Sequence, residues 1–309
     1  MSASAPPVVV VGELLVDIVS YPDGRSAEHV GGSPANVAVG LARLGHDTHV
    51  ACLVGEDARG ARCAEHVEAS GAHLLPGSRS PHHPTSTALA TIDEHGAASY
   101  VFDLHWDLPP VQLPDGTGHL HTGSIATTLT PGDAEVEDAM RRAGAQGTVS
   151  YDPNVRPTIM GDVADVRPRV EHLVGLSDVV KCSEDDLEWL YPGDSPSAVM
   201  ARWADLGASL TVVTLGGDGV VWRAASGEEG RAPARIKDVV DTVGAGDSFM
   251  AGLVSGLLDT GLLGSPDARE RLARATLDDV DPAVERALAT SGVTVRHAGA
   301  YAPTREEIR

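Results

Sequence analysis

The chain has 309 residues and a formal net charge of −21. A surface this acidic would repel nucleic acid and anionic membranes, so we expect neither as a partner. No apolar stretch approaches the length of a membrane span, and the opening segment lacks the pattern of a signal peptide. The three cysteines are scattered and form neither a metal-binding pattern nor a disulfide framework, which favours a reducing cytoplasm.

The predicted elements alternate between strands and helices. The run at 8–11 is wholly β-branched, as in a buried parallel strand. Further strands are expected at 48–54, 119–125, 148–151, 179–182 and 210–215, and helices at 31–45, 57–70, 131–143 and 282–291. Such alternation predicts a parallel sheet covered by helices on both faces.

Two pairs of strand-like runs do not fit that alternation. Residues 86–92 and 97–103 flank the turn-forming segment 93–96, and a second pair lies near 18–21 and 27–30. We interpret them as a small antiparallel lid inserted into the main domain. A lid would keep water out of a reaction that water could intercept.

The segment DTVGAGDSFMAGL, residues 241–253, carries the strongest chemical signal. Gly244 and Gly246 lack a Cβ atom, so the backbone can turn tightly and direct several N–H groups at one point. The helix that follows adds the positive end of its dipole, which favours an anion. Asp247 beside such a turn could take a proton from an attacking hydroxyl. The plainer alternative is that Asp247 only favours the helix dipole.

A second motif, GGSPANVAVGLARLG, occupies residues 31–45. Gly31 and Gly32 allow the backbone to approach a ligand, and Asn36 offers a donor and acceptors on the first helical turn. Ser33 is expected to be the N-cap, with Pro34 at the first helical position. Alone, this motif would also suit a close-packed helix. The two motifs together, in this order, are far more specific.

With both motifs, the chain resembles the PfkB (ribokinase-like) family of carbohydrate kinases over nearly its whole length, and its GELLVD and DPNVR segments resemble the fructokinase-like branch. The resemblance implies a single ribokinase-like catalytic domain over residues 1–309, with a three-layer α/β/α architecture and a mostly parallel central sheet. The small antiparallel β lid would come from about 16–30 and 86–110. The reaction would use ATP and Mg²⁺, with K⁺ as a further candidate cofactor.

The resemblance also assigns the site, residue by residue. The catalytic base is Asp247, behind an anion loop of Gly244, Ala245 and Gly246, and the sugar-binding residues are Asp17, Gly31, Gly32, Asn36 and Arg156. The nucleotide-binding residues are Lys181, Thr214, Gly216 and Gly219, and the metal candidates are Asp186 for Mg²⁺ and Asp241 for K⁺. Two plainer alternatives stay open: Ser183 and Asp186 have capping-box spacing, and the glycines after Thr214 suit an ordinary turn. The pairs His82-His83 and His119-x-His121 lack partners at metal-binding spacing, so we expect no metal there.

Fructose is the first choice of sugar. The alternative is 2-keto-3-deoxygluconate, whose carboxylate would suit the Arg156 guanidinium, followed by ribose or a nucleoside. Leu15 stands where ribokinases have Asn, which disfavours ribose. A non-catalytic sugar or nucleotide sensor is the alternative from another class, but it would be expected to lack the base. Lid-to-lid pairing into a homodimer is a further expectation.

Overall fold

A computed structural model describes residues 5–93 and 98–309. Its larger sheet has nine strands in the described part of the chain, in the order β15-β14-β13-β12-β11-β10-β1-β4-β6. The strands from β6 to β13 run parallel, and β14 and β15 are antiparallel to their neighbours. The bounds are β1 (Val8–Val11), β4 (Thr48–Ala51), β6 (His73–Leu74), β10 (His119–Gly123), β11 (Thr148–Asp152), β12 (Val179–Ser183), β13 (Leu210–Thr214), β14 (Val220–Arg223) and β15 (Glu229–Ala232).

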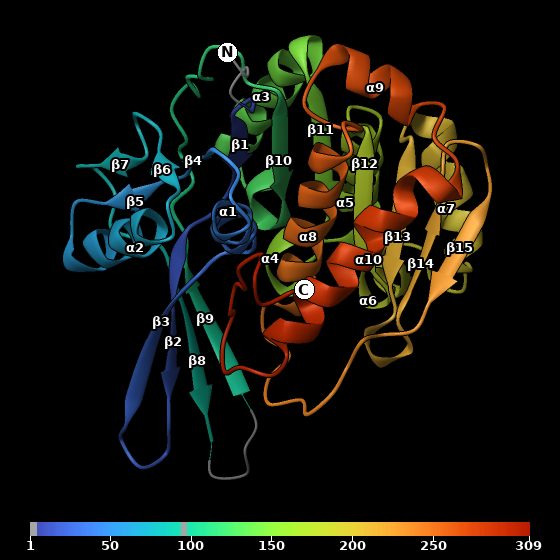
Figure 1. The fold of residues 1–309 in the computed structure, drawn as a ribbon. Coiled ribbons are helices and arrows are strands. Elements are labelled where there is room, and N and C mark those ends of the chain that lie inside the picture. Colours follow the sequence, from blue (N-terminus) through green and yellow to red (C-terminus); the bar gives the residue numbers. More distant parts are fainter. Residues whose placement is uncertain (1–4, 94–97) are drawn as a thin grey trace.

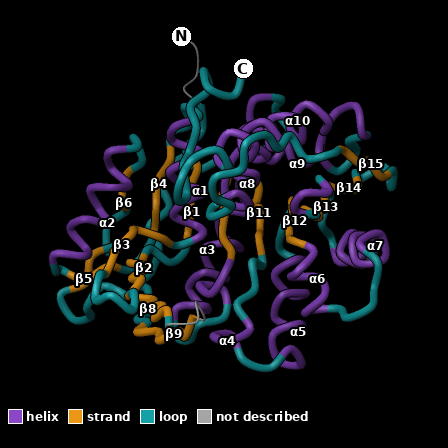
Figure 2. The backbone as a smooth tube through the Cα atoms, turned by 90° about the horizontal axis from the view of Figure 1, so that it is seen from below, coloured by secondary structure: helices purple, strands orange, loops and turns teal. Residues whose placement is uncertain are grey.

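Helices cover both faces of this sheet (Figures 1 and 2). They are α1 (Ser33–Arg43), α2 (Ala58–Ala69), α3 (Gly132–Gln146), α4 (Pro157–Met160), α5 (Val163–Val174), α6 (Glu184–Leu190), α7 (Pro196–Leu206), α8 (Ala245–Asp259), α9 (Pro266–Leu272) and α10 (Leu277–Thr294), with the short 3₁₀ turns η1 (Ser124–Thr127) and η2 (Gly216–Asp218).

The period of two along each strand divides the core into two clusters. In β1, Val8 and Val10 pack with α1, α8 and α10, whereas Val9 and Val11 pack with α3 and α5 on the other face. This is the expected three-layer α/β/α arrangement. Helices α1 and α8 pack closely, since a Cβ added at Gly40 would lie 2.6 Å from the Ala251 Cβ. Their contact brings the two sequence motifs together.

The small sheet has the order β3-β2-β8-β9 and extends away from the helices at one end of the molecule (Figure 1). It consists of β2 (Leu15–Ser20), β3 (Ser26–Gly31), β8 (Thr87–Ile92) and β9 (Ala98–Asp103). Both hairpins are antiparallel, as expected, and β2 joins β8 in parallel. Most of the predicted turn at 93–96 lies outside the described residues. A separate short pair joins β5 (Val54–Gly55) to β7 (Arg79–Ser80).

Three expected elements differ in extent. The run at 48–54 divides into β4 and β5, and β10 ends at Gly123, where η1 begins. The last helix begins at Leu277 rather than at Pro282, because Thr276 and Asp279 form a capping box one and a half turns earlier. Among the described residues, no helix is both long and apolar enough to span a membrane.

Candidate active site

The carboxyl ends of the parallel strands meet along one edge of the central sheet, which is where open α/β sheets bind ligands. At this edge α8 begins with Gly244 as its N-cap, in the left-handed conformation with φ of 73°. A Cβ at Gly244 would lie 2.6 Å from Ala300, so glycine is required on steric grounds as well. The Ala245 N–H donates to Thr242 O at 3.2 Å. The next amides of the first turn, those of Gly246 and Asp247, have no acceptor within a regular helix.

Asp247 is held by the first turn of α1. The Ser33 hydroxyl donates to Asp247 Oδ1 at 2.7 Å, and Asn36 Nδ2 donates to Oδ2 at 2.8 Å. Two motifs more than two hundred residues apart therefore meet at one carboxylate. Each oxygen of Asp247 has a donor, so the orientation of the carboxylate is fixed.

Ser33 does not cap α1, contrary to the expectation from sequence. Gly32 is the N-cap, with φ of 112°. A Cβ at Gly32 would lie 2.3 Å from the Glu13 carbonyl oxygen, so no side chain fits at that position. The Ser33 hydroxyl is thus available to Asp247, a role that sequence reasoning missed.

Asp17 lies on β2 against the glycine pair. A Cβ at Gly31 would lie 2.1 Å from Asp17 Oδ2, so only glycine allows the carboxylate to sit there. The surrounding protein partly removes the Asp17 carboxylate from water, and this desolvation raises its pKa. The charges of His29 and Arg156 act in the opposite direction but do not cancel it. A series of contacts therefore runs from Asp17 through the glycine pair to Ser33 and Asn36, and ends at Asp247.

Arg156 follows β11 and is exposed. Its Nη1 donates to Asn154 Oδ1 at 2.7 Å and to the carbonyl oxygens of Asn154 and Val155 at 3.1 and 2.9 Å. Its charge also lowers the pKa of both Glu13 and Asp17. The guanidinium therefore belongs to the same group of charges as Asp17.

Lys181 forms a buried ion pair that was not predicted. Its Nζ lies 2.7 Å from Asp152 Oδ2, and the two side chains are 4% and 1% exposed. A Cβ at Gly246 would lie 3.3 Å from this Nζ, so the cation borders the anion loop. Burial disfavours the charge of Lys181, but the carboxylates of Asp152, Asp186 and Asp247 raise its pKa.

Asp152 completes this pair with one unused oxygen. Its Oδ1 is buried without a hydrogen-bond partner among the described residues. Burial raises the pKa of Asp152 to about 6, against the lowering effect of Lys181. The sequence shows only that Asp152 and Lys181 each lie near the end of an expected strand; their pairing follows from the adjacency of β11 and β12.

Asp186 forms the capping box with Ser183. Its Oδ2 accepts from the Ser183 N–H at 2.8 Å and hydroxyl at 2.7 Å, and its Oδ1 accepts from the Val155 N–H at 2.8 Å. Both oxygens are therefore engaged, and the carboxylate joins α6 to the loop that carries Arg156. A role toward Mg²⁺ stays a prediction. No cluster of three or more His, Cys, Asp or Glu side chains that could hold a metal occurs in the described ranges.

Asp241 links the anion loop to the C-terminal segment. Its Oδ1 accepts from the Val243 N–H at 3.0 Å and its Oδ2 from the Gly299 N–H at 2.8 Å. These backbone bonds lower the pKa of Asp241. A K⁺ site at Asp241 stays a prediction.

The expected nucleotide turn follows β13 at the same edge as Lys181. The Thr214 hydroxyl donates to Cys182 O at 3.3 Å. Gly216 and Gly219 have φ of 53° and 99°, and a Cβ at Gly219 would lie 2.0 Å from Ala232 O. The φ of Gly216 favours glycine, and at Gly219 no side chain fits, so the turn presents backbone without side chains at these two positions. His119 hydrogen-bonds to the hydroxyls of Thr148 and Ser150, and His121 hydrogen-bonds to Ser150.

The site geometry agrees with comparisons to known proteins. A model of the pfkB family carbohydrate kinases matches residues 6–307. This chain belongs to the pfkB family. It is therefore a carbohydrate kinase, a phosphotransferase with an alcohol group as acceptor.

The relatives indicate the branch of the family. A fructokinase of Klebsiella pneumoniae is 36% identical over 282 residues, which cover 85% of this chain and 87% of that protein. A fructokinase of Escherichia coli is 35% identical over 277 residues, with coverage of 85% and 87%. A Vibrio cholerae fructokinase, solved in a form with fructose, ADP and potassium ion bound, has a TM-score of 0.80 at 26% identity and covers 100% of this chain and 98% of its own. The expected family, fold and fructokinase-like branch are confirmed.

Proposed function

We propose that this pfkB-family kinase is a fructokinase that transfers the γ-phosphoryl group of ATP to a sugar hydroxyl, with Asp247 as the general base. The observation that carries the proposal is the position of Asp247 at the first turn of α8, hydrogen-bonded through both oxygens to Ser33 and Asn36. The base, the helix N-terminus and the glycine motif meet at one point. Phosphoryl transfer needs this combination of positioning and charge stabilisation.

The sugar would lie along the surface from Asp17 to Asn36. The Asp17 carboxylate would accept hydrogen bonds from sugar hydroxyls. The backbone of Gly31 and Gly32 packs directly against Asp17 and Glu13, and its peptide groups would contact the sugar beside Asp17. Asn36, already bonded to Asp247, orients the hydroxyl that reacts. Arg156 adds a fifth contact at the side of Asp17.

The reacting hydroxyl would give its proton to Asp247 as its oxygen attacks the γ-phosphorus, and ADP would leave. The Gly246 and Asp247 amides, in the turn shaped by Gly244 and Ala245, hold the equatorial oxygens of the transferring group. Lys181 Nζ, beside Gly246, supplies a full positive charge to the same oxygens.

The nucleotide would lie on the turn formed by Thr214, Gly216 and Gly219. A divalent cation suits the adjacent region, because Asp152 Oδ1 is buried there with no hydrogen-bond partner among the described residues. When bound, Mg²⁺ neutralises the β- and γ-phosphate oxygens, and Asp186 would act through water because its own oxygens are engaged. Asp241 and nearby carbonyl oxygens are the candidate ligands for K⁺.

The test is a coupled ADP-release assay with MgATP and a panel of acceptors. Fructose should give the highest kcat/KM. A higher value for 2-keto-3-deoxygluconate would assign Arg156 to a substrate carboxylate and replace fructose as the substrate. A preference for ribose or a nucleoside would reject both fructose and 2-keto-3-deoxygluconate as the substrate. ATP binding without turnover on any acceptor would favour a sensor and reject the catalytic role.

The edge of the small sheet is proposed as a homodimer contact. On β9, Tyr100 and Val101 are 60% and 63% exposed, and an unpaired edge strand is a template for pairing. A Val101→Lys variant should shift the mass in solution from dimer to monomer. A monomeric wild-type protein would contradict this contact. We also propose a cytoplasmic location, consistent with three buried free cysteines in the described chain.

A further inference from the structure

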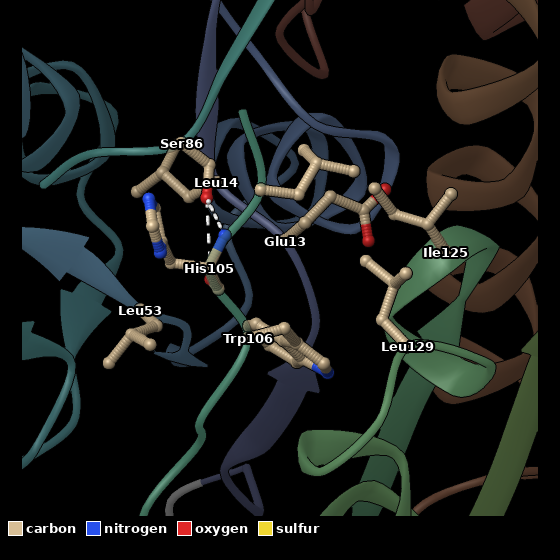
Figure 3. A pocket seen from close by; sticks show the side chains of 9 residues that line it. Glu13, Leu14, Leu53, Ser86, His105, Trp106, Ile125 and Leu129 are labelled. Carbon is tan, nitrogen blue, oxygen red and sulfur yellow. Dashed lines mark hydrogen bonds between the residues drawn. The ribbon is translucent and has the colours of Figure 1, made fainter. Parts of the chain in front are cut away.

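Glu13 lies between β1 and β2, at the carboxyl edge of the sheet, and is only 7% exposed. Its Oε2 accepts a hydrogen bond from the Ala126 N–H at 3.3 Å, and the Ser124 hydroxyl also bonds to the carboxyl. Figure 3 shows the carboxyl directed toward Ile125, with Ser86 and His105 on the other side of the pocket. The function assigned above gives this side chain no role.

The partner of Glu13 is η1, the turn where the chain leaves β10. Ser124 has φ of 55°, a conformation that residues other than glycine rarely adopt. Both backbone groups of Ala126 are bonded: its N–H donates to Glu13, and its carbonyl oxygen accepts from Trp106 Nε1 at 2.9 Å. Glu13 and Trp106 thus fix the position of this turn.

The backbone of Glu13 contacts the glycine motif. Its carbonyl oxygen would be 2.3 Å from a Cβ at Gly32, and a Cβ at the preceding Gly12 would be 2.2 Å from Pro34 Cγ. One residue therefore touches η1 through its side chain and the N-cap of α1 through its backbone. Any shift of Glu13 would be transmitted to Asn36 through the first turn of α1.

The pocket beside Glu13 is too small to hold a ligand. Its volume is about 10 Å³, room for at most one water molecule, and its other lining residues are mainly apolar. The ionisable groups that face Glu13 are Arg156, from the loop after β11, and His105, across the pocket. The carboxyl is therefore placed to hold backbone rather than to bind a small molecule.

We propose that Glu13 is a positioning residue for the sugar acceptor, which holds η1 and the Gly31-Gly32 turn in the geometry that binds the sugar. The inference rests on the proposed function, because it takes Asp17, Gly32 and Asn36 as the sugar site. It adds a residue that contacts neither substrate and acts through the backbone.

The charge of Glu13 is consistent with a functional role. Burial raises its pKa to about 7, although its hydrogen bonds and the charge of Arg156 lower it. Burying an ionisable carboxyl costs stability, and such groups are found most often at functional sites, where binding or catalysis needs them. The ionised carboxylate can accept from both the Ala126 N–H and the Ser124 hydroxyl, so η1 should be held best above pH 7.

The test is the steady-state kinetics of Glu13→Gln as a function of pH. The amide keeps the shape of the side chain but cannot ionise. We expect the fructose KM to rise about tenfold and the ATP KM to stay within about twofold, as for lost acceptor positioning. In the wild-type protein kcat/KM for fructose should rise with pH through about 7. This rise of kcat/KM with pH should be smaller in Glu13→Gln.

Two parallel variants separate the possible outcomes. Asp17→Asn should raise the fructose KM whether or not Glu13 matters, so an unchanged KM in that variant would reject the proposed sugar site itself. If Asp17→Asn raises KM but Glu13→Gln keeps the wild-type KM and pH profile, the positioning role is wrong. Equal losses of fructose and ATP affinity in Glu13→Gln would also reject it, because they would indicate general distortion.

Discussion

The two edges of the central sheet use buried charge in opposite ways. At the amino edge, Asp178 accepts two bonds from Arg269, at 2.7 and 3.0 Å, and one from the Val149 N–H at 2.7 Å. Both of its oxygens are satisfied. At the carboxyl edge, Asp152 Oδ1 has no partner among the described residues, and the pKa of Glu13 is raised to about 7.

The backbone conformation also differs between the two edges of the sheet. Two non-glycine residues at the carboxyl edge have positive φ. Ser124 directly follows β10, and Asn154 lies just beyond β11. Backbone strain and incompletely paired charges are typical of ligand-binding sites, whereas fully paired charges are typical of residues that only stabilise the fold. The same residue types are therefore fully paired at one end of the sheet and incompletely paired at the other, which is the end where we propose the active site.

The largest effect on stability should come from breaking the Lys181–Asp152 pair. Lys181→Met leaves Asp152 buried without its cation, which should lower the free energy of unfolding by about 3–5 kcal/mol. Adding Asp152→Asn should recover much of that loss in urea unfolding, but not turnover, because the cation beside Gly246 is still missing. Recovery of both would show that the pair is only structural.

Glu13 should make stability depend on pH. Its folded-state pKa of about 7 lies above the reference value of 4.5, so folding favours the protonated form. Its contribution is fully present below pH 4.5 and is lost as pH rises through 7, by about 3 kcal/mol. Glu13→Gln should therefore gain stability over the wild type between pH 5 and 8 in urea unfolding. Parallel pH dependence in the two proteins would contradict the assigned environment.

The amino edge supplies the matched control. Asp178→Asn weakens a satisfied ion pair whose Arg269 partner is 36% exposed, so stability should fall by about 1–2 kcal/mol. The fructose KM and kcat should match the wild type, because the substitution lies at the edge away from the site. A change in KM comparable to that of Glu13→Gln would remove the distinction between the edges.

The smallest effect should come from Ser33. Ser33→Ala removes one of two hydrogen bonds to Asp247 while Asn36 keeps the other, so kcat should fall about five- to tenfold. The fructose KM should change little, and Ser33→Thr, which keeps a hydroxyl, should recover most of the turnover. Identical kinetics in Ser33→Ala would show that Asn36 alone orients the base.

Features that depend on neighbouring residues could be predicted from the sequence. The apolar run of β1, the glycine turn before Asp247 and both hairpins of the small sheet are set by neighbouring residues, and the structure has each of them. The hairpin of β14 and β15 was not predicted, because Glu229–Ala232 is polar and has no strand periodicity. The start of α10 was missed because Pro282 was taken as a helix start, although the capping residues precede it.

Contacts between distant residues could not be read from the chain. The Lys181–Asp152 pair depends on the adjacency of β11 and β12, and the Ser33–Asp247 bond depends on the close packing of α1 on α8. Neither leaves a pattern in local sequence, because strand order and helix packing are set by the whole fold. The motifs predicted which residues matter, and the fold decided which of them touch.

The most direct measurement is the turnover of Asp247→Asn in the coupled ADP-release assay, at saturating fructose and MgATP. The substitution keeps the shape of the side chain and removes the base. We predict that kcat falls by about 10²–10⁴ with the fructose KM nearly unchanged. Wild-type turnover in this variant, with an intact fold, would contradict Asp247 as the base.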